Sequence, residues 1–211
     1  MVQSLKKSEI KKEQDPSVAK QWDNDVPLED KYNDFAAIAD KIGICMFGSF
    51  RPGTGPVGRS MAVAKRSGPD FLFLANAHSQ KFDDISENPM VALSFQNTSN
   101  QDWISLTGQV VKTTNDDPRI GELFNKSVSA WFGDLGDGVH TGKADDPRVT
   151  LIEVQAKYIS YWKHTTTGSI GFVAEVVTAS ATGGVAQTGK LRQFESEEIQ
   201  QLRSKHSSFT S

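Results

Sequence analysis

The chain has 211 residues and a formal net charge of −3, and 37% of its residues are hydrophobic, which suits one globular domain with a sizeable core. Charges of both signs are mixed along it, which excludes a basic face for nucleic acid. It carries no secretory signal, no apolar run of membrane-spanning length and a single cysteine, Cys45, so we expect a cytoplasmic protein without a membrane partner.

The first elements follow from a change of pattern near residue 26. Residues 1–26 are polar and carry little periodicity, so we expect a flexible N-terminal arm. Residues 27–211 then form a single domain that begins with a helix over Leu28–Ile42, where apolar residues recur at helical spacing. A strand over Ile42–Phe50 follows, and its Cys45 is expected to be a buried core residue rather than a nucleophile.

Hairpin strands dominate the middle of the chain. Turns rich in Gly, Pro, Asn and Asp separate predicted strands over Val57–Lys65, Phe71–Asn76, Met90–Gln96, Trp103–Lys112 and Val149–Trp162. Short helices are expected from Ser79, capped by its own hydroxyl, and from Asp116-Asp117-Pro118. Many hairpin strands with only short helices predict an antiparallel α+β fold, as a closed or half-open barrel.

The tail forms a C-terminal extension from about residue 163. It contains an apolar stretch, a short strand over Leu191–Phe194 and a helix from Ser196. The tetrad Asp-Asp-Pro-Arg occurs at residues 116–119 and again at 145–148, but the flanking sequences are unlike each other. Recurrent turn chemistry therefore explains the repeat better than a duplicated domain.

The clearest candidate site lies between residues 59 and 81. Arg59 stands on one strand, and Ser79 and Lys81 open a helix after the next strand. A helix N-terminus, a hydroxyl and two cations together suit a phosphate group, and the small residues between them leave room for a flat ring. Taken singly, these residues are typical surface charges and a plain helix cap, so only the joint pattern points to a ligand.

That pattern resembles a known family. Arg-x-Met at 59–61, Phe-x-x-Asn at 73–76 and Ser-x-Lys at 79–81 are similar to the pyridoxamine 5′-phosphate oxidase-like FMN-binding split-barrel family. Within it, the chain looks closest to the general stress protein 26 group and its fungal blue-light-inducible relatives. The resemblance covers about residues 28–162, and it is supported in the same order by residues 85–89, 103–108, 131–133 and 161–162.

The resemblance implies an α+β antiparallel split β-barrel that forms a homodimer, with FMN in a cleft between the subunits. By position, Arg59 and Lys81 would hold the phosphate, helped by Ser79 and with Gln80 on the phosphate side. The remaining residues implied to approach the flavin are Ser60, Met61, Ala62, Leu74, Ala75, Trp103 and Trp162. The oxidases proper carry Arg-Lys after the serine, where this chain has Gln80-Lys81, which weakens the case for pyridoxamine phosphate as the substrate.

Three functions stay open on the sequence. The first is a flavin-dependent oxidoreductase of unknown substrate, in which the flavin carries the chemistry and no side chain need act as an acid or base. The second is a non-catalytic flavin-binding stress or light-response protein. The third is a barrel for another flat cofactor, such as a deazaflavin or haem, or for none. A metal is not expected, because His140 and His164 lack metal-ligand spacing with each other or with Cys45.

Overall fold

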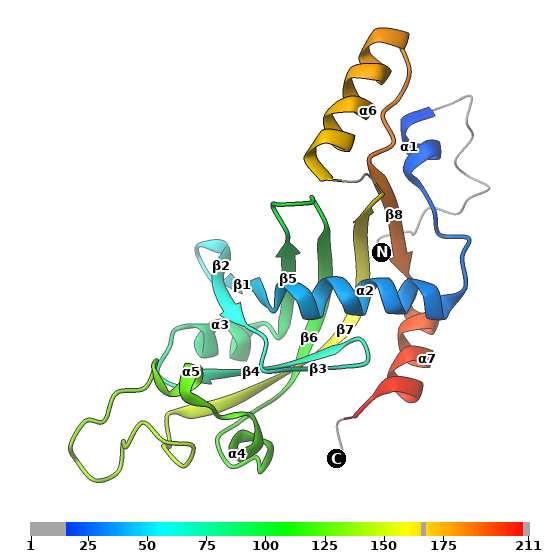
Figure 1. Ribbon diagram of the computed structural model, residues 1–211. Coiled ribbons are helices and arrows are strands. Elements are labelled where there is room, and N and C mark those ends of the chain that lie inside the picture. The colour runs from blue at the N-terminus through cyan, green and yellow to red at the C-terminus, as the bar shows by residue number, and fades with distance from the viewer. Residues whose placement is uncertain (1–15, 166–167, 209–211) are drawn as a thin grey trace.

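One antiparallel sheet organises the structure, a computed structural model that describes residues 16–165 and 168–208 (Figure 1). The strand order is β2-β1-β5-β6-β7-β4-β3, and β8 pairs with β7 off this path. The strands are β1 (Ile44–Arg51), β2 (Gly55–Ala62), β3 (Lys65–Ser67), β4 (Asp70–Asn76), β5 (Met90–Gln96), β6 (Trp103–Thr114), β7 (Val149–His164) and β8 (Gly189–Phe194).

The two edge strands of this sheet, β2 and β3, are joined directly by residues 63–64, as in a split barrel. β2 and β3 lie at opposite ends of the strand order but follow each other in the chain. Between them, the Val63 N–H donates to the carbonyl of Gly43 and the Ala64 N–H donates to the carbonyl of Leu72. The predicted α+β antiparallel barrel is therefore confirmed, and the strand expected over Val57–Lys65 is divided at this crossing point.

Helices lie around the barrel. Their bounds are α1 (Pro16–Gln21), α2 (Leu28–Ile42), α3 (Lys81–Glu87), α4 (Arg119–Leu123), α5 (Lys126–Ser129), α6 (Gly168–Thr182) and α7 (Ser196–His206). α2 has the predicted bounds and crosses in front of β5, β6 and β7 (Figure 1). It ends because Gly43 adopts a left-handed conformation, with φ of +64°, and its N–H caps the carbonyl of Ala39.

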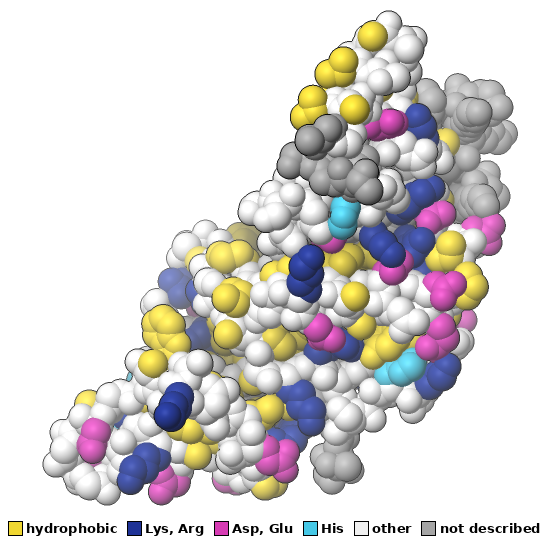
Figure 2. Space-filling model, viewed as in Figure 1, with side chains coloured by type: hydrophobic (Ala, Val, Ile, Leu, Met, Phe, Trp, Pro, Cys, Tyr) yellow, Lys and Arg dark blue, Asp and Glu magenta, His cyan; other side chains and the backbone are white. Residues whose placement is uncertain are grey.

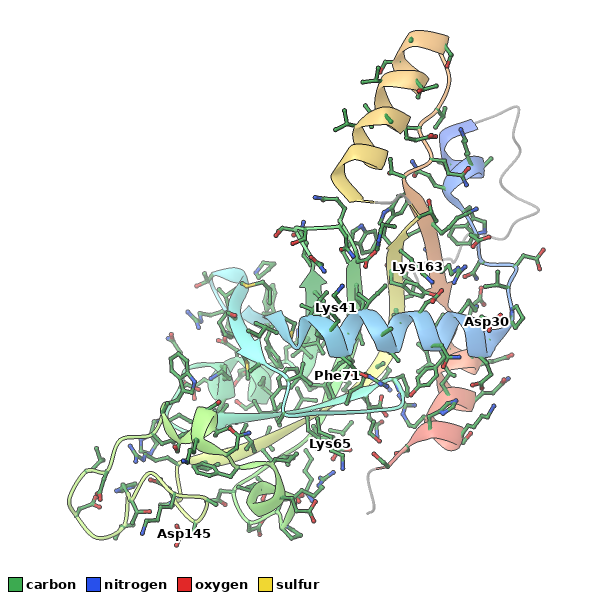
Figure 3. All side chains as sticks on the ribbon, in the orientation of Figure 1. Asp30, Lys41, Lys65, Phe71, Asp145 and Lys163 are labelled. Carbon is green, nitrogen blue, oxygen red and sulfur yellow. The ribbon has the colours of Figure 1, made fainter. Side chains whose placement is uncertain are left out.

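The apolar stripe of α2 closes the open side of the barrel. Tyr32, Phe35 and Ile38 are buried against the sheet, and the Phe35 ring meets the edge of the Phe71 ring at 6.3 Å between centroids. Figure 3 shows Phe71 beneath the helix. Burial of each large apolar side chain is worth about 1.5–3 kcal/mol, so this contact anchors α2 to the barrel. Cys45 also lies in this core, where burial raises the pKa of its thiol to about 12.

β4 and the first residues of β7 are buried on both faces, which the alternating pattern did not predict. One face of β4 contributes Phe71 and Phe73 to the main core, while Leu72 faces a second cluster with Val149 and Leu151 of β7. The segment around α4 and α5 covers that second face with Ile120, Leu123, Phe124, Val128 and Phe132.

The sequence predicts a flexible arm over residues 1–26. Residues 1–15 lie outside the described residues, but the segment after α1 packs against β8. Trp22 is only 8% exposed and forms a parallel bridge with Leu191 of β8. Asp23 pairs with Arg192 at 2.8 Å. The scattered apolar residues of this segment form no helical stripe, but β8 provides a tertiary surface for one of them.

The C-terminal segment belongs to the same core. β8 pairs with β7 along Ile159–His164, and Phe194, Ile199 and Leu202 join the main cluster. The apolar stretch from residue 168 is the helix α6, which projects beyond the end of the sheet and exposes Val173, Val176 and Val177. Figure 2 shows hydrophobic side chains gathered on it. Among the described residues, no helix is both long and apolar enough to cross a membrane.

Candidate functional site

A cluster of charged side chains joins the β1–β2 hairpin to α3. Arg59 points from β2 toward α3, where its Nη2 donates to Asp84 Oδ2 at 3.1 Å and its Nη1 donates to Ser49 Oγ at 2.7 Å. Arg51 of β1 donates to the same carboxylate through Nε at 2.9 Å and Nη2 at 3.2 Å. The Arg51 guanidinium and the Ser49 and Arg59 donors lower the pKa of Asp84 to about 2, so the carboxylate is ionised.

Lys81, the first residue of α3, stands beside this cluster. Its Nζ donates to Ser79 Oγ at 2.5 Å, and among the described residues no carboxylate lies within ion-pair distance of it. Partial burial and the charge of Arg59 lower the pKa of Lys81. Lys81 thus lies against Ser79 and close enough to Arg59 to feel its charge, and of these two cations only Arg59 has an acidic partner among the described residues.

Ser79 does not cap the helix as predicted. α3 begins at Lys81 after Gln80, an exposed residue without a side-chain cap bond. The Ser79 hydroxyl instead donates to the carbonyl of Asn76 at 2.7 Å, in a tight turn where the Ser79 N–H donates to the same oxygen. Its lone pairs face Lys81, and the cations rather than the short helix give this site its positive character.

Residues 60–62 lie on a free sheet edge, because β2 is the last strand on its side of the sheet. Ser60 and Ala62 are exposed on the outer face, whereas Met61 is 9% exposed and packs in the main core beside Cys45. Alternation along the strand thus allows Met61 only a backbone contact with a ligand on the outer face. The backbone groups of this edge, which pair with no other strand in the described part of the chain, could bond a ring.

Leu74 and Ala75 cannot both face one ligand, because they point to opposite faces of β4. Ala75 belongs to the main core, and Leu74 packs against the second cluster with Leu123 and Phe124. A ligand on either face of β4 could therefore meet the side chain of only one of them, and the implied contact of Leu74 and Ala75 with the flavin stays a prediction.

Trp103 and Trp162 lie away from the cationic cluster. They pair with each other across β6 and β7, which are three and four strands from β2 in the sheet order. Three strand spacings amount to roughly 14 Å across the sheet. Trp162 instead covers Gly189 of β8, where a Cβ would come within 2.3 Å of the indole. A single chain does not bring the two tryptophans to Arg59.

Sequence reasoning missed Ser49, Arg51 and Asp84. The signal was present in strand parity, since residues 49, 51 and 59 all fall on the inward face of the hairpin. Asp84 lies one helical turn after Lys81, on the buried side of α3. The described residues hold no group of three His, Cys, Asp or Glu side chains arranged for a metal ion.

The outer face of the barrel is free of charge over β2, β1 and β5. Strand register puts Ile44, Met46 and Phe50 of β1 on this face, and Ile44, Met46 and Phe50 are exposed. Their neighbours on β2 and β5 are Pro56, Gly58, Ser60, Ala62, Met90, Ala92, Ser94 and Gln96. An exposed sheet face with large apolar side chains and no charge is typical of an interaction surface.

Comparisons with known proteins agree with this architecture. A profile of the family described as "Pyridoxamine 5′-phosphate oxidase like" matches residues 30–187. The chain is 35% identical over 195 residues to protein bli-3 of Neurospora crassa, an alignment that covers 91% of this chain and 92% of that protein.

Two solved structures share the fold. A protein related to general stress protein 26, from Clostridium acetobutylicum, has a TM-score of 0.57 at 16% identity, covering 82% of this chain and 99% of that one. General stress protein 26 of Bacillus anthracis has a TM-score of 0.53 at 18% identity, covering 62% of this chain and 92% of that one. The profile match spans most of the chain, and the chain therefore belongs to the pyridoxamine 5′-phosphate oxidase-like family.

Proposed function

We propose that the protein binds FMN, with the phosphate held by Arg59, Ser79 and Lys81. The observation that carries this proposal is the convergence of Arg59 with the partly buried Lys81, an ammonium without a carboxylate partner among the described residues. Two like charges held together are stabilised by an anion between them. A phosphate monoester carries close to two negative charges at neutral pH and accepts several charge-assisted hydrogen bonds.

The edge of β2 supports a place for the flavin ring. Ser60 and Ala62 have small, exposed side chains one and three residues from Arg59, and no strand within residues 16–165 and 168–208 pairs with the outer edge of β2. A flat ring can approach this backbone closely and bond its free N–H and C=O groups. The tryptophans Trp103 and Trp162 would reach a flavin only from another copy, since their own chain holds them away from Arg59.

The protein is proposed to act as a homodimer in the cytoplasm. The uncharged outer face, with exposed Ile44, Met46 and Phe50, is the surface that a second copy would cover. Cys45, the one cysteine of the sequence, is a buried thiol, which suits a reducing compartment.

Bound FMN would supply hydride or electron transfer, and the proposed activity is that of a flavin-dependent oxidoreductase of unknown substrate. Steady oxidation of NAD(P)H by the purified flavoprotein tests this activity. Bound FMN without turnover would support the alternative of a non-catalytic carrier or sensor. An absorbance spectrum typical of another flat cofactor would show that the protein binds that cofactor and not FMN, whichever of the two functions holds.

The phosphate assignment is tested by comparing FMN with riboflavin, which lacks the phosphate. Arg59→Ala and Lys81→Ala should each weaken FMN binding by about tenfold to hundredfold, as expected for a charged hydrogen bond, and leave riboflavin binding nearly unchanged. Lys41→Ala, at an exposed lysine on α2 (Figure 3), is the matched control and should change neither affinity. Equal losses for both ligands would contradict the assignment.

A further inference from the structure

Asp84 is buried at the centre of the cationic cluster, although it is not among the residues proposed to touch the flavin. Its two carboxylate oxygens accept from Arg51, Arg59 and Ser49. Ser49 is also buried, and its hydroxyl accepts from Arg59 while donating to Asp84 at 2.9 Å. Asp84 and Ser49 thus form a bracket with one hydrogen bond to each terminal nitrogen of the Arg59 guanidinium.

The bracket leaves Arg59 with bonding capacity to spare. A guanidinium has five N–H groups in a fixed plane, and the bracket takes two of them. Because both terminal nitrogens are held, the plane of the guanidinium is fixed and the remaining N–H groups keep a set direction. An arginine held in this way loses less conformational freedom when it binds an anion than a freely rotating one.

The charges of the cluster also indicate that Asp84 holds Arg59 in place. Arg51, Arg59 and Lys81 bring three positive charges, and the buried Asp84 offsets one of them. Asp83, exposed on the same helix, also acts on Arg51. Without the Asp84 carboxylate, the three cations would repel one another and Arg59 would turn toward solvent. With it, a net positive site remains beside Lys81.

We propose that Asp84, together with Ser49, is a positioning residue that aims Arg59 at the phosphate of the ligand. This inference rests on the proposed function, because it assumes that Arg59 meets a phosphate. It assigns no contact between Asp84 and the ligand. The competing role is purely structural, in which Asp84 keeps Arg59 for itself and Arg59 takes no part in binding.

The experiment measures the ratio of riboflavin to FMN dissociation constants, which isolates what the phosphate contributes to affinity. Asp84→Asn should lower this ratio by about tenfold, and Ser49→Ala by about threefold to tenfold. Arg51→Gln is the matched control. It removes a cation that pairs with the Asp84 carboxylate but leaves the hydrogen bonds of Asp84 and Ser49 to Arg59, so it should change the ratio by less than about threefold. Thermal melting of each variant reports any general loss of structure.

A double-mutant cycle separates positioning from other effects. If Asp84 acts through Arg59, then Asp84→Asn has no further effect on the ratio once Arg59→Ala is present. Should Asp84→Asn fail to fold, the same cycle is run with Ser49→Ala, which keeps the carboxylate. A ratio lowered by Arg59→Ala but unchanged by Asp84→Asn and Ser49→Ala would overturn the positioning role alone. A ratio unchanged by Arg59→Ala would overturn the phosphate site itself.

Discussion

Asp117 and Asp146 make the same three hydrogen bonds, each to the arginine two residues further on. Asp117 accepts from the backbone N–H, Nε and Nη2 of Arg119, at 3.0, 2.9 and 2.9 Å. Asp146 accepts from the same three groups of Arg148, at 2.9, 3.0 and 2.7 Å. The repeated Asp-Asp-Pro-Arg is thus one local structure used twice, before a helix and before a strand, which supports the interpretation as turn chemistry.

Mutation of the two aspartates of the second tetrad should change the melting temperature by very different amounts. Asp146 is buried and bonds to Arg148, so Asp146→Asn leaves the buried guanidinium without its counter-charge. Its melting temperature should fall by roughly 5–10 °C. Asp145 is exposed in the loop (Figure 3), and Asp145→Asn should shift the melting temperature by less than about 2 °C. Similar shifts for both variants, measured by calorimetry, would contradict this assignment.

The lowered pKa of Asp84 predicts a specific loss of stability in acid. Hydrogen bonds from Arg51, Ser49 and Arg59 lower this pKa from 3.8 to about 2 in the folded protein. A carboxylate whose pKa is lower when folded stabilises the protein above its unfolded pKa, and this contribution disappears as the pH falls through the folded value. The window is therefore about pH 4 to pH 2.

Melting curves of the wild type and Asp84→Asn measure this effect. The difference in melting temperature between the two proteins should be constant from pH 7 to about pH 5 and shrink as the pH falls from about 4 toward 2. A difference that stays the same down to the lowest pH at which the wild type folds would show that the charge of Asp84 contributes nothing to stability.

At the scale of elements, β8 joins the segment after α1 to the barrel. It pairs with β7 on one side and receives the segment after α1 on the other, where the Asp23 N–H donates to the Leu191 carbonyl at 3.0 Å. Asn24 Oδ1 accepts from the backbone N–H of Gln193 at 2.8 Å. Residues 22–24 therefore act almost as a further strand, made possible by an element more than 160 positions away in the sequence.

Substitution of a buried and an exposed tryptophan tests whether the packing on β8 stabilises the protein. Trp22 is 8% exposed and Trp131 is 83% exposed. Trp22→Ala should destabilise the protein by about 3 kcal/mol, the low end for removal of a buried aromatic side chain. Trp131→Ala, the matched control, should stay within about 0.5 kcal/mol. Denaturant unfolding measures both, and an unchanged stability of Trp22→Ala would restore the sequence-based expectation of a dispensable arm.

Trp22→Phe refines the same test. Within the described part of the chain, the buried indole Nε1 of Trp22 has no hydrogen-bond partner. Phenylalanine keeps most of the apolar contact and removes this unpaired donor, so Trp22→Phe should cost much less than Trp22→Ala.

At the scale of the whole molecule, the barrel has two faces of different character. Its inner face forms the main core beneath α2, whereas the outer face of β1, β2 and β5 is uncharged and exposes apolar side chains. A monomer would leave this face in contact with water.

A charge at the centre of this face should separate the proposed dimer. Met46 is 50% exposed on β1, and Met46→Glu should give a monomer in sedimentation at micromolar concentration. Leu135 is 61% exposed in the loop between α5 and β7, outside the strands of this face, so Leu135→Glu should remain dimeric. A monomeric wild type, or a dimeric Met46→Glu variant, would contradict the proposed interface.

The sequence by itself determined the features that depend on local periodicity and turn chemistry. The bounds of α2 follow from an apolar stripe ended by Gly43, and β5 follows from strict alternation over Met90–Gln96. Hairpin turns between such strands are enough to predict an antiparallel barrel. The grouping of Arg59, Ser79 and Lys81 as a candidate site was also predicted from motif order, with Arg59 on one strand and Ser79 and Lys81 after the next predicted strand.

Tertiary structure alone decided what lies between elements distant in the chain. Asp84 becomes a bracket for Arg59 only when α3 packs against the β1–β2 hairpin. Trp22 is buried only because β8 pairs with the end of β7, and Leu74 is covered only because the α4–α5 segment packs on the second face of β4. Periodicity reports which side of an element is apolar, but the partner of that side depends on contacts that chain order does not encode.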